Sequence, residues 1–384
     1  MEKEPLRFKN GKFKIMLVGD LHECYDIHSD NAANQAHDMV SLLKKGVEEL
    51  NPDLVIYMGD VVSGDDIQQM RSVINRVVTP VVSKDIPFAV IFGNHDRERA
   101  VDLKTQMKLY NEYENCYFFN ADNKIRGIGN YNLLVKATDS DKDILNLWFF
   151  DSGQLSEDPE VSVYDWVHED QIEWYKKTAK KLANKNGKKV IPALAFQHIP
   201  VPEEYELIRE AKPYEYFDSV PGEGRWNDRR YVLKQHVEGY MGEAPCSPCY
   251  NSGEFDAWKE VGDVMGAFFG HDHMNDFVGY VDGIMLAQCK TAGFRPYTDG
   301  CRAGLRLITV DENDVENFTT KMYYFKDFGL KSKSLGIYQR NVTDRQDLKI
   351  KATIAAVETV AFVTMSVIAI KKIKELKNKE NSKK

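Results

Sequence analysis

The chain has 384 residues, 51 of them basic and 59 acidic, which gives a formal net charge of −8. With 43% hydrophobic and 29% charged residues it has a globular composition, so a chain that is disordered or collagen-like throughout is excluded. The 14 residues 371–384 hold seven Lys and two Glu, so the remaining chain carries −13, which disfavours non-specific binding of nucleic acid. Any binding of phosphate groups is therefore expected to be local.

The N-terminal residues MEKEPLRFKNGKFK are charged and lack the apolar stretch of a secretory signal. This predicts that the chain starts in the cytoplasm. The chain has six Cys, at positions 24, 116, 246, 249, 289 and 301, which are expected to be reduced there. Cys246-Ser-Pro-Cys249 could be half of a zinc site, but no second Cys-x-x-Cys completes it, so a loop turn is the preferred interpretation.

Apolar, β-branched runs end repeatedly at Gly, Asp or His, and helical periodicity lies between several of them. In the first half, strands are expected at 13–18, 54–58 and 88–92, with helices at 36–50 and 66–79. Further on, strands are expected at 144–150, 193–196, 265–269, 277–281, 284–288, 303–310 and 319–325, with a helix at 168–185. This order indicates an α/β protein with βαβ units and a mixed second sheet.

Segment 199–262 is rich in Pro, Gly, Tyr and charge and has weak periodicity. We interpret it as a long excursion near the mouth of a site, because long ordered loops are often functional. In open α/β sheets, ligands bind at the carboxyl ends of the strands. Polar residues directly after the expected strands are therefore the candidate site.

Five short polar clusters follow expected strands: Asp20-Leu21-His22, Gly59-Asp60, Gly93-Asn94-His95-Asp96, Gln197-His198 and Gly270-His271-Asp272-His273. Carboxylates, imidazoles and amide oxygens are ligands that suit Mn, Zn or Fe. Side chains at i and i+2 of a strand share a face, so Asp20 with His22, and His271 with His273, are expected to chelate as pairs. Two cations about 3.5–4 Å apart that share one carboxylate need this number of ligands.

Each cluster alone has a simpler explanation. A single Asp-x-His is common at exposed strand ends, and Asn94 and Asp96 would also cap a helix that begins near Arg97. The five clusters occur together, in order, each after a hydrophobic strand. Their joint occurrence favours a site for two metal ions.

The ordered set D-x-H, G-D, G-N-H-D, H and G-H-x-H resembles the calcineurin-like metallophosphoesterase superfamily, over about residues 12–325. The stretches FFDSG (149–153), FQHIPVPEEY (196–205), CSPCYNSG (246–253) and FFGHDHMNDF (268–277) resemble the branch with short plant purple-acid-phosphatase-like proteins and fungal cell-cycle phosphatases. The resemblance implies a four-layer α/β/β/α sandwich. It also implies two metal ions of the Mn, Fe, Zn or Ni type.

The resemblance assigns roles to individual positions. One metal ion is expected at Asp20, His22, Asp60 and His273, and the other at Asp60, Asn94, His198 and His271. His95 is expected to face the substrate phosphate, with Asp96 as its orienting partner or as a helix cap. Ser63 stands where purple acid phosphatases carry a tyrosinate and protein phosphatases an Asp. This departure predicts an enzyme that is not purple and leaves His95 without its usual carboxylate partner.

The expected function is hydrolysis of phosphate monoesters by a metal-activated hydroxide, with an unidentified phosphorylated substrate. A phosphodiesterase or nuclease is the alternative within enzymes, although the acidic body disfavours nucleic acid. A non-catalytic scaffold on the same fold is the alternative outside enzymes. Seven matching ligand positions favour the enzyme over the scaffold.

The stretch 352–370 is apolar except for Glu358 and precedes the Lys-rich run. Its 19 residues are long enough to span a bilayer, which makes a membrane helix the first interpretation. A cytosolic N-terminus would place the Lys run outside, against the positive-inside tendency, so a helix lying on the membrane surface or packing on the protein stays open. The expected organisation is a catalytic domain at 1–330, a linker at 331–350 and a C-terminal helix at 351–384.

Overall fold

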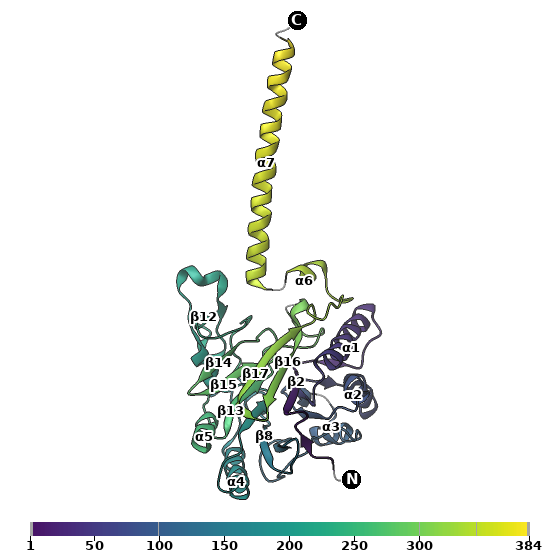
Figure 1. The fold of residues 1–384 in the computed structure, drawn as a ribbon, viewed down its shortest axis with the longest axis vertical. Coiled ribbons are helices and arrows are strands. Elements are labelled where there is room, and N and C mark those ends of the chain that lie inside the picture. The colour runs from purple at the N-terminus through teal and green to yellow at the C-terminus, as the bar shows by residue number, and fades with distance from the viewer. Residues whose placement is uncertain (1–2, 99, 299, 343, 382–384) are drawn as a thin grey trace. The chain divides into compact units, whose positions relative to one another are not determined.

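Two β-sheets form the centre of the computed structural model, which describes residues 3–98, 100–298, 300–342 and 344–381 (Figure 1). The five-stranded sheet has the order β17-β16-β2-β4-β6. Its strands are β2 (Lys12–Val18), β4 (Leu54–Met58), β6 (Phe88–Ile91), β16 (Gly304–Asp311) and β17 (Asp314–Tyr324). β2, β4 and β6 run parallel, and β16 lies antiparallel to both β2 and β17. The predicted βαβ units are therefore present.

Helices connect the parallel strands of this sheet. α1 (Asp30–Leu50) joins β2 to β4, α2 (Ile67–Val82) joins β4 to β6, and α3 (Leu103–Tyr110) follows β6. Ser29 and Asp66 cap the first two helices by accepting hydrogen bonds from backbone N–H groups one turn on. Before each of these two helices a two-residue strand leaves the main sheet, and β3 (Glu23–Cys24) pairs there with β5 (Val62–Ser63).

The seven-stranded sheet has the order β1-β7-β8-β9-β13-β15-β14. Its strands are β1 (Leu6–Arg7), β7 (Tyr131–Lys136), β8 (Asp143–Phe149), β9 (Ala193–Gln197), β13 (Val264–Phe269), β14 (Val278–Val281) and β15 (Ile284–Gln288). β8, β9, β13 and β15 run parallel, whereas β7 and β14 are antiparallel to their neighbours β8 and β15. The predicted mixed second sheet is thus the larger of the two.

Successive residues of the central strand β8 face two different hydrophobic cores. Leu147 and Phe149 belong to a core that both sheets share with α1 and α2, whereas Trp148 belongs to a second core with α4 (Glu169–Lys185) and α5 (Glu254–Val261). Apolar side chains on both faces explain why these strands read as continuous hydrophobic runs. The layers are helices, sheet, sheet and helices (Figure 1). The predicted four-layer α/β/β/α fold is confirmed.

The excursion 199–262 contains more regular structure than its weak periodicity suggested. A small antiparallel sheet forms from β10 (Ile208–Glu210), β11 (Val220–Pro221) and β12 (Arg230–Leu233) in the order β10-β12-β11. A 3-10 helix at Pro202–Leu207 precedes β10, two more at Pro213–Asp218 and Gly224–Trp226 lie between the strands, and α5 closes the segment. These pieces are too short to produce a recognisable hydrophobic period.

The chain divides into two compact units, residues 1–340 and 341–384. The first includes most of α6 (Ile337–Asn341), and the second contains α7 (Arg345–Asn381). The expected linker 331–350 is therefore wrong in its first half, because Ser332, Lys333 and Ser334 bind the carboxylate of Asp38 on α1. Within α7, the window Asp347–Leu376 has a mean hydropathy of 2.0, is exposed, and is long and apolar enough to cross a membrane.

Replacing Asp38 with Ala is expected to destabilise the first unit by about 1–3 kcal/mol, because buried hydroxyl and N–H donors lose their acceptor. Burial alone would raise the pKa of Asp38, but the bonds from Ser332, Lys333 and Ser334 outweigh it and lower that pKa. The stabilisation is then complete above the unfolded-state pKa of about 3.9 and is lost as the pH falls through the folded-state pKa.

Urea unfolding of the parent and of D38A at several pH values checks this expectation. The gap in free energy of unfolding should be full near neutral pH and shrink in acid. A gap that stays constant down to the acid range would contradict the assignment of this carboxylate as the ionised anchor of residues 332–334.

Candidate metal centre

The five predicted polar clusters meet at the carboxyl ends of five parallel strands. Asp20 and His22 follow β2, Asp60 follows β4, Asn94 follows β6, His198 follows β9, and His271 and His273 follow β13. Three of these strands belong to one sheet and two to the other. The centre therefore lies where the carboxyl edges of both sheets come together.

Four of the seven side chains are on residues with left-handed backbone conformations. The φ angles are 42° at Asp20, 44° at His22, 50° at Asp60 and 72° at His271. Such angles do not occur in a strand, so the alternation of strand side chains is not what positions these donors. The expected pair Asp20 and His22 does converge in one donor group, whereas the expected pairing of His271 with His273 is wrong, because these two lie in different groups. Tight turns beyond the strand ends aim these side chains instead.

Two glycines make room for these turns. A Cβ on Gly59, whose φ is 94°, would lie 2.4 Å from Nδ1 of His198. A Cβ on Gly93 would lie 2.2 Å from Oδ1 of Asp60. Only glycine allows the chain to pass so close to the carboxylate and the imidazole.

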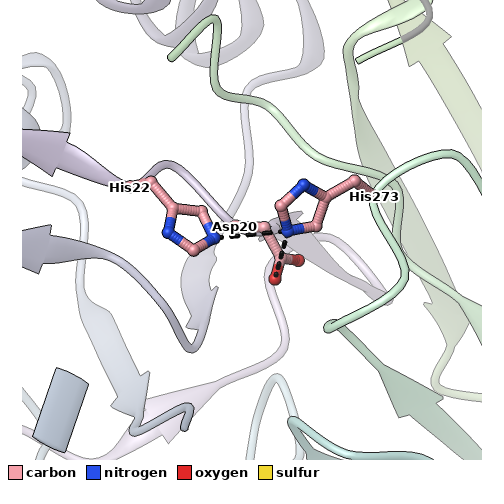
Figure 2. Close-up of side chains that lie close together, drawn as sticks. All are labelled: Asp20, His22 and His273. Carbon is pink, nitrogen blue, oxygen red and sulfur yellow. Dashed lines mark hydrogen bonds and ion pairs between the residues drawn. The ribbon is translucent and has the colours of Figure 1, made fainter. Parts of the chain in front are cut away.

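The first group of donors consists of Asp20, His22 and His273, whose side chains converge on one point (Figure 2). Nε2 of His22 lies 3.2 Å from Nε2 of His273, and Nε2 of His273 lies 3.7 Å from Oδ1 of Asp20. Nδ1 of His273 donates to the carbonyl oxygen of Tyr297 at 3.2 Å, so its Nε2 carries the lone pair. Burial lowers the pKa of His22 to about 4 and that of His273 to about 3, which favours neutral, ligating rings.

The second group contains Asp60, His198 and His271, with Asn94 beside it. Nε2 of His198 lies 3.0 Å from Oδ1 of Asn94 and 3.2 Å from Oδ2 of Asp60. The same Oδ2 lies 3.6 Å from Nε2 of His22 in the first group. Asp60 therefore stands between the two groups, in the position of a shared ligand.

The chemistry of these donors fits a pair of cations. Nδ1 of His198 donates to the carbonyl oxygen of Met58 at 2.8 Å, while its Nε2 faces two oxygen acceptors. Only a second ring proton or a cation can satisfy that arrangement. Among the described residues, buried Nε2 of His271 has no hydrogen-bond partner. A metal ion would occupy both positions without an unmatched polar atom.

Without a metal ion, bound protons balance the negative charge of the carboxylates in the centre. Burial would lower the pKa of His198, but the adjacent Asp60 outweighs it and raises that pKa to about 10. Burial would raise the pKa of Asp60, but His198 and His22 bring it below its usual value. Burial, reinforced by Asp60, raises the pKa of Asp20. A cation at the centre would replace the proton on His198 and favour both carboxylates in ionised form.

His95 stands at the solvent edge of the centre, with its side chain 48% exposed. Its ring centroid lies 5.2 Å from that of His22, and its Nδ1 lies 2.8 Å from Oε1 of Glu98. The expectation that Asp96 orients His95 is wrong, because Glu98 is the residue in contact. The sequence contains this signal, since residues i and i+3 share a face of the 3-10 helix His95–Arg97 that Glu98 ends.

The side chain of Asp96 binds the backbone of the loops that carry the metal donors. Its carboxylate accepts hydrogen bonds from the backbone N–H groups of Asp60 and Gly93, both at 2.8 Å, and of Val61 at 3.2 Å. Burial, together with Asp60, raises the pKa of Asp96 to about 6. The alternative role as a helix cap is not what the structure shows, since its partners are N–H groups of the loop after β4 and of Gly93, which precedes it in its own loop. Asp96 therefore fixes the backbone that carries Asp60.

Replacing Asp96 with Asn is expected to weaken metal binding by about 10–100-fold, the usual effect of losing a group that orients ligands. The amide nitrogen would face a backbone N–H where the carboxylate oxygen now accepts, so we also expect a loss of about 1–3 kcal/mol in stability. Metal titration and urea unfolding measure the two effects. Asp102→Asn, which keeps a side-chain cap at the N-terminus of α3, is the control, and unchanged metal affinity in D96N would refute the role.

Three further contacts were not evident from the sequence. Tyr297 stacks on His273 with ring centroids 4.2 Å apart and binds Glu243 through its hydroxyl group at 2.7 Å. Tyr164 packs on His271 at 4.4 Å. Both tyrosines lie outside the five polar clusters, and aromatic residues in loops give no specific signal of a site.

Cys246 lies with His271 and Asp272 in a third group whose donor atoms are within 4.8 Å of one another. Burial raises the pKa of its thiol well above the usual value, which disfavours the thiolate that zinc requires. Cys249 is not part of this group. Cys246 and Cys249 lie in a segment without helix or strand, as the loop interpretation expects.

Comparison with known proteins identifies the fold family. The family model for calcineurin-like phosphoesterases matches residues 13–275, which span all five clusters. The chain belongs to the calcineurin-like phosphoesterase family.

Relatives within the calcineurin-like phosphoesterases agree with the predicted branch. The chain is 31% identical over 336 residues to "Probable inactive purple acid phosphatase 29" of Arabidopsis thaliana, covering 81% of this chain and 80% of that protein. It is 30% identical over 286 residues to "Phosphatase DCR2" of Saccharomyces cerevisiae, covering 70% of this chain and 45% of that protein. The solved structure of a dimetal phosphatase from Danio rerio matches with a TM-score of 0.45 at 12% identity, over 81% of this chain and 99% of that one. The predicted resemblance is confirmed.

Proposed function

We propose that this protein hydrolyses phosphate monoesters with two metal ions held by the seven donors of the centre. The observation that carries the proposal is the position of Asp60, whose Oδ2 lies 3.2 Å from Nε2 of His198 and 3.6 Å from Nε2 of His22. One carboxylate thereby serves both donor groups, which is the arrangement that a metal pair about 3.5–4 Å apart requires. Mn, Fe, Zn and Ni all suit these ligands.

When bound, two such ions supply positive charge to the phosphoryl oxygens and lower the pKa of coordinated water toward about 7. The protein's own residues would hold the metal ions and orient the groups around the substrate. Backbone N–H of His95 donates to Oδ1 of Asp60 at 2.8 Å, which leaves Oδ2 directed at the two histidine groups. With Nδ1 of His95 held by Glu98, we assign its Nε2 to the substrate, where it would donate to a phosphoryl oxygen or to the leaving oxygen.

The deciding experiment uses protein stripped of metal and then refilled singly with Mn, Zn, Fe or Ni. Hydrolysis of p-nitrophenyl phosphate and of bis-p-nitrophenyl phosphate is measured for each ion. Turnover that metal restores, with the monoester hydrolysed faster, is the expected result. A faster diester would favour the phosphodiesterase alternative.

A non-catalytic binding module is the second candidate, because three plant relatives carry "probable inactive" in their names. All seven donors are present in this chain, with buried imidazoles held in ligating orientations, which supports catalysis. Binding of metal ions without turnover on either ester would favour the module. Failure to bind metal would remove the proposed centre altogether.

We further propose that α7 anchors the cytoplasmic catalytic domain to a membrane. Its apolar window is exposed, and the Lys-rich run that follows would interact with anionic headgroups. Full-length protein is expected to float with liposomes in a density gradient, whereas a chain that ends at residue 349 stays at the bottom. Equal behaviour of the two chains would contradict the anchor.

A further inference from the structure

The excursion carries an exposed aromatic tip, which we define as Tyr214, Tyr216 and Phe217 in the 3-10 helix Pro213–Asp218. Tyr214 is 75% exposed and Phe217 is 76% exposed, with Tyr216 at 57%. Isolated exposed apolar residues are common, but three neighbouring aromatic rings on one projecting turn form a surface suited to a partner.

The tip is held in a fixed shape. Arg209 donates two hydrogen bonds to the carboxylate of Glu215, at 2.9 and 2.7 Å, and this carboxylate also accepts from the backbone N–H of Lys212. The guanidinium of Arg230 lies 4.5 Å from the ring centroid of Tyr216. The rings are therefore presented by a braced turn, which reduces the entropy lost when they are covered.

The short connection between α6 and α7 keeps α6 close to the proposed bilayer. α6 ends at Asn341 and α7 begins at Arg345, and four residues span at most about 14 Å. The apolar stretch begins at Ala352, seven helical rises after Arg345, and these rises add about 10 Å. On α6 itself, Ile337 and Tyr338 are 82% and 62% exposed.

The excursion lies at the same end of the first unit as α6 (Figure 1). Segment 209–230, which contains the tip, has five basic and five acidic residues and no net charge. A neutral surface with exposed tyrosine and phenylalanine matches the headgroup region of a zwitterionic bilayer, where aromatic side chains are enriched.

We propose that the aromatic tip inserts into the headgroup region of the membrane that holds α7, so that the catalytic domain lies against the bilayer. This inference rests on the proposed anchor. It adds a second contact between the domain and the lipid, one that is driven by aromatic insertion and therefore insensitive to salt.

The test places a new tryptophan at the tip of the full-length chain. Phe217→Trp and Tyr214→Trp are each reconstituted in vesicles of 1-palmitoyl-2-oleoyl phosphatidylcholine, with and without lipid brominated near the headgroup. Lys180→Trp, at an exposed position of α4 at the opposite end of the unit, is the matched control. The signal of the chain's own five tryptophans is subtracted with the parent protein, and circular dichroism checks that each variant is folded.

We expect the added emission at 214 and 217 to shift to the blue and to be quenched by brominated lipid, at low and high salt alike, while emission at 180 is unchanged. Vesicle-bound protein without quenching at the tip would overturn the inference and leave the anchor intact. Protein that does not bind vesicles would overturn both. Equal quenching at 180 would indicate non-specific adsorption, and a concentration-dependent blue shift without vesicles would assign the tip to a second copy of the chain; either result overturns the inference.

Discussion

Asp60→Asn is expected to abolish metal-dependent phosphate release, with a loss on the order of 10³-fold or more in turnover. The reason is geometric, since Oδ2 of Asp60 lies within 3.6 Å of one histidine from each donor group. An amide in its place has one neutral oxygen and a nitrogen that cannot ligate. Loss of the charge also removes the group that raises the pKa of His198. Both metal positions should therefore be weakened together.

Turnover of p-nitrophenyl phosphate and metal content per chain measure the two effects. Asp66→Asn is the matched control, because it lies in the next turn of the same connection and Asn also caps α2. D66N should retain two metal ions and full turnover. If D60N kept normal metal content and turnover, the shared-ligand assignment would be wrong.

His95→Ala is expected to lower kcat by about 10²–10³-fold while metal content stays unchanged. The hydrogen bond from residue 95 to Oδ1 of Asp60 comes from the backbone N–H, which alanine retains. Within the described part of the chain, the contact of this side chain with the metal donors is an edge contact with the ring of His22. The substitution should therefore slow catalysis without affecting metal binding. A variant with full turnover at saturating metal would refute the role of His95.

Glu98 provides an internal check on that role. If it acts by positioning His95, Glu98→Gln should slow turnover by about tenfold in the parent and have no further effect in H95A. Independent, additive losses in the double variant would show that Glu98 acts in another way. This comparison distinguishes a positioning residue from one that contacts the substrate.

The sequence predicted the fold well where the strands are long and hydrophobic. β2, β4, β9 and β13 lie within one or two residues of their expected bounds, because burial on both faces makes them continuous apolar runs that end at the ligand turns. β7 and the small sheet of the excursion were missed. β7 alternates buried and half-buried residues, and the small sheet consists of strands of two to four residues, so neither gives a strong pattern.

The seven predicted metal donors lie together in the structure, but the orientation of the supporting residues could not be foreseen. Asp96 follows His95 directly, which suggested a contact, yet its side chain points to the backbone of Asp60 and Gly93. The spacing of residues in the sequence indicates which types of donor are present. It does not give the turn angles that decide where each donor points, and here those angles are left-handed at four ligands.

These left-handed ligand turns set activity against stability. Histidine at positive φ, as at His22 and His271, costs free energy that a glycine or an asparagine would save, so these turns store backbone strain. Substitutions that discard a ligand, such as His22→Gly, relieve part of this strain. Loss of catalysis is thus an easy evolutionary path on this fold, and an intact set of seven ligands is a feature that selection must maintain.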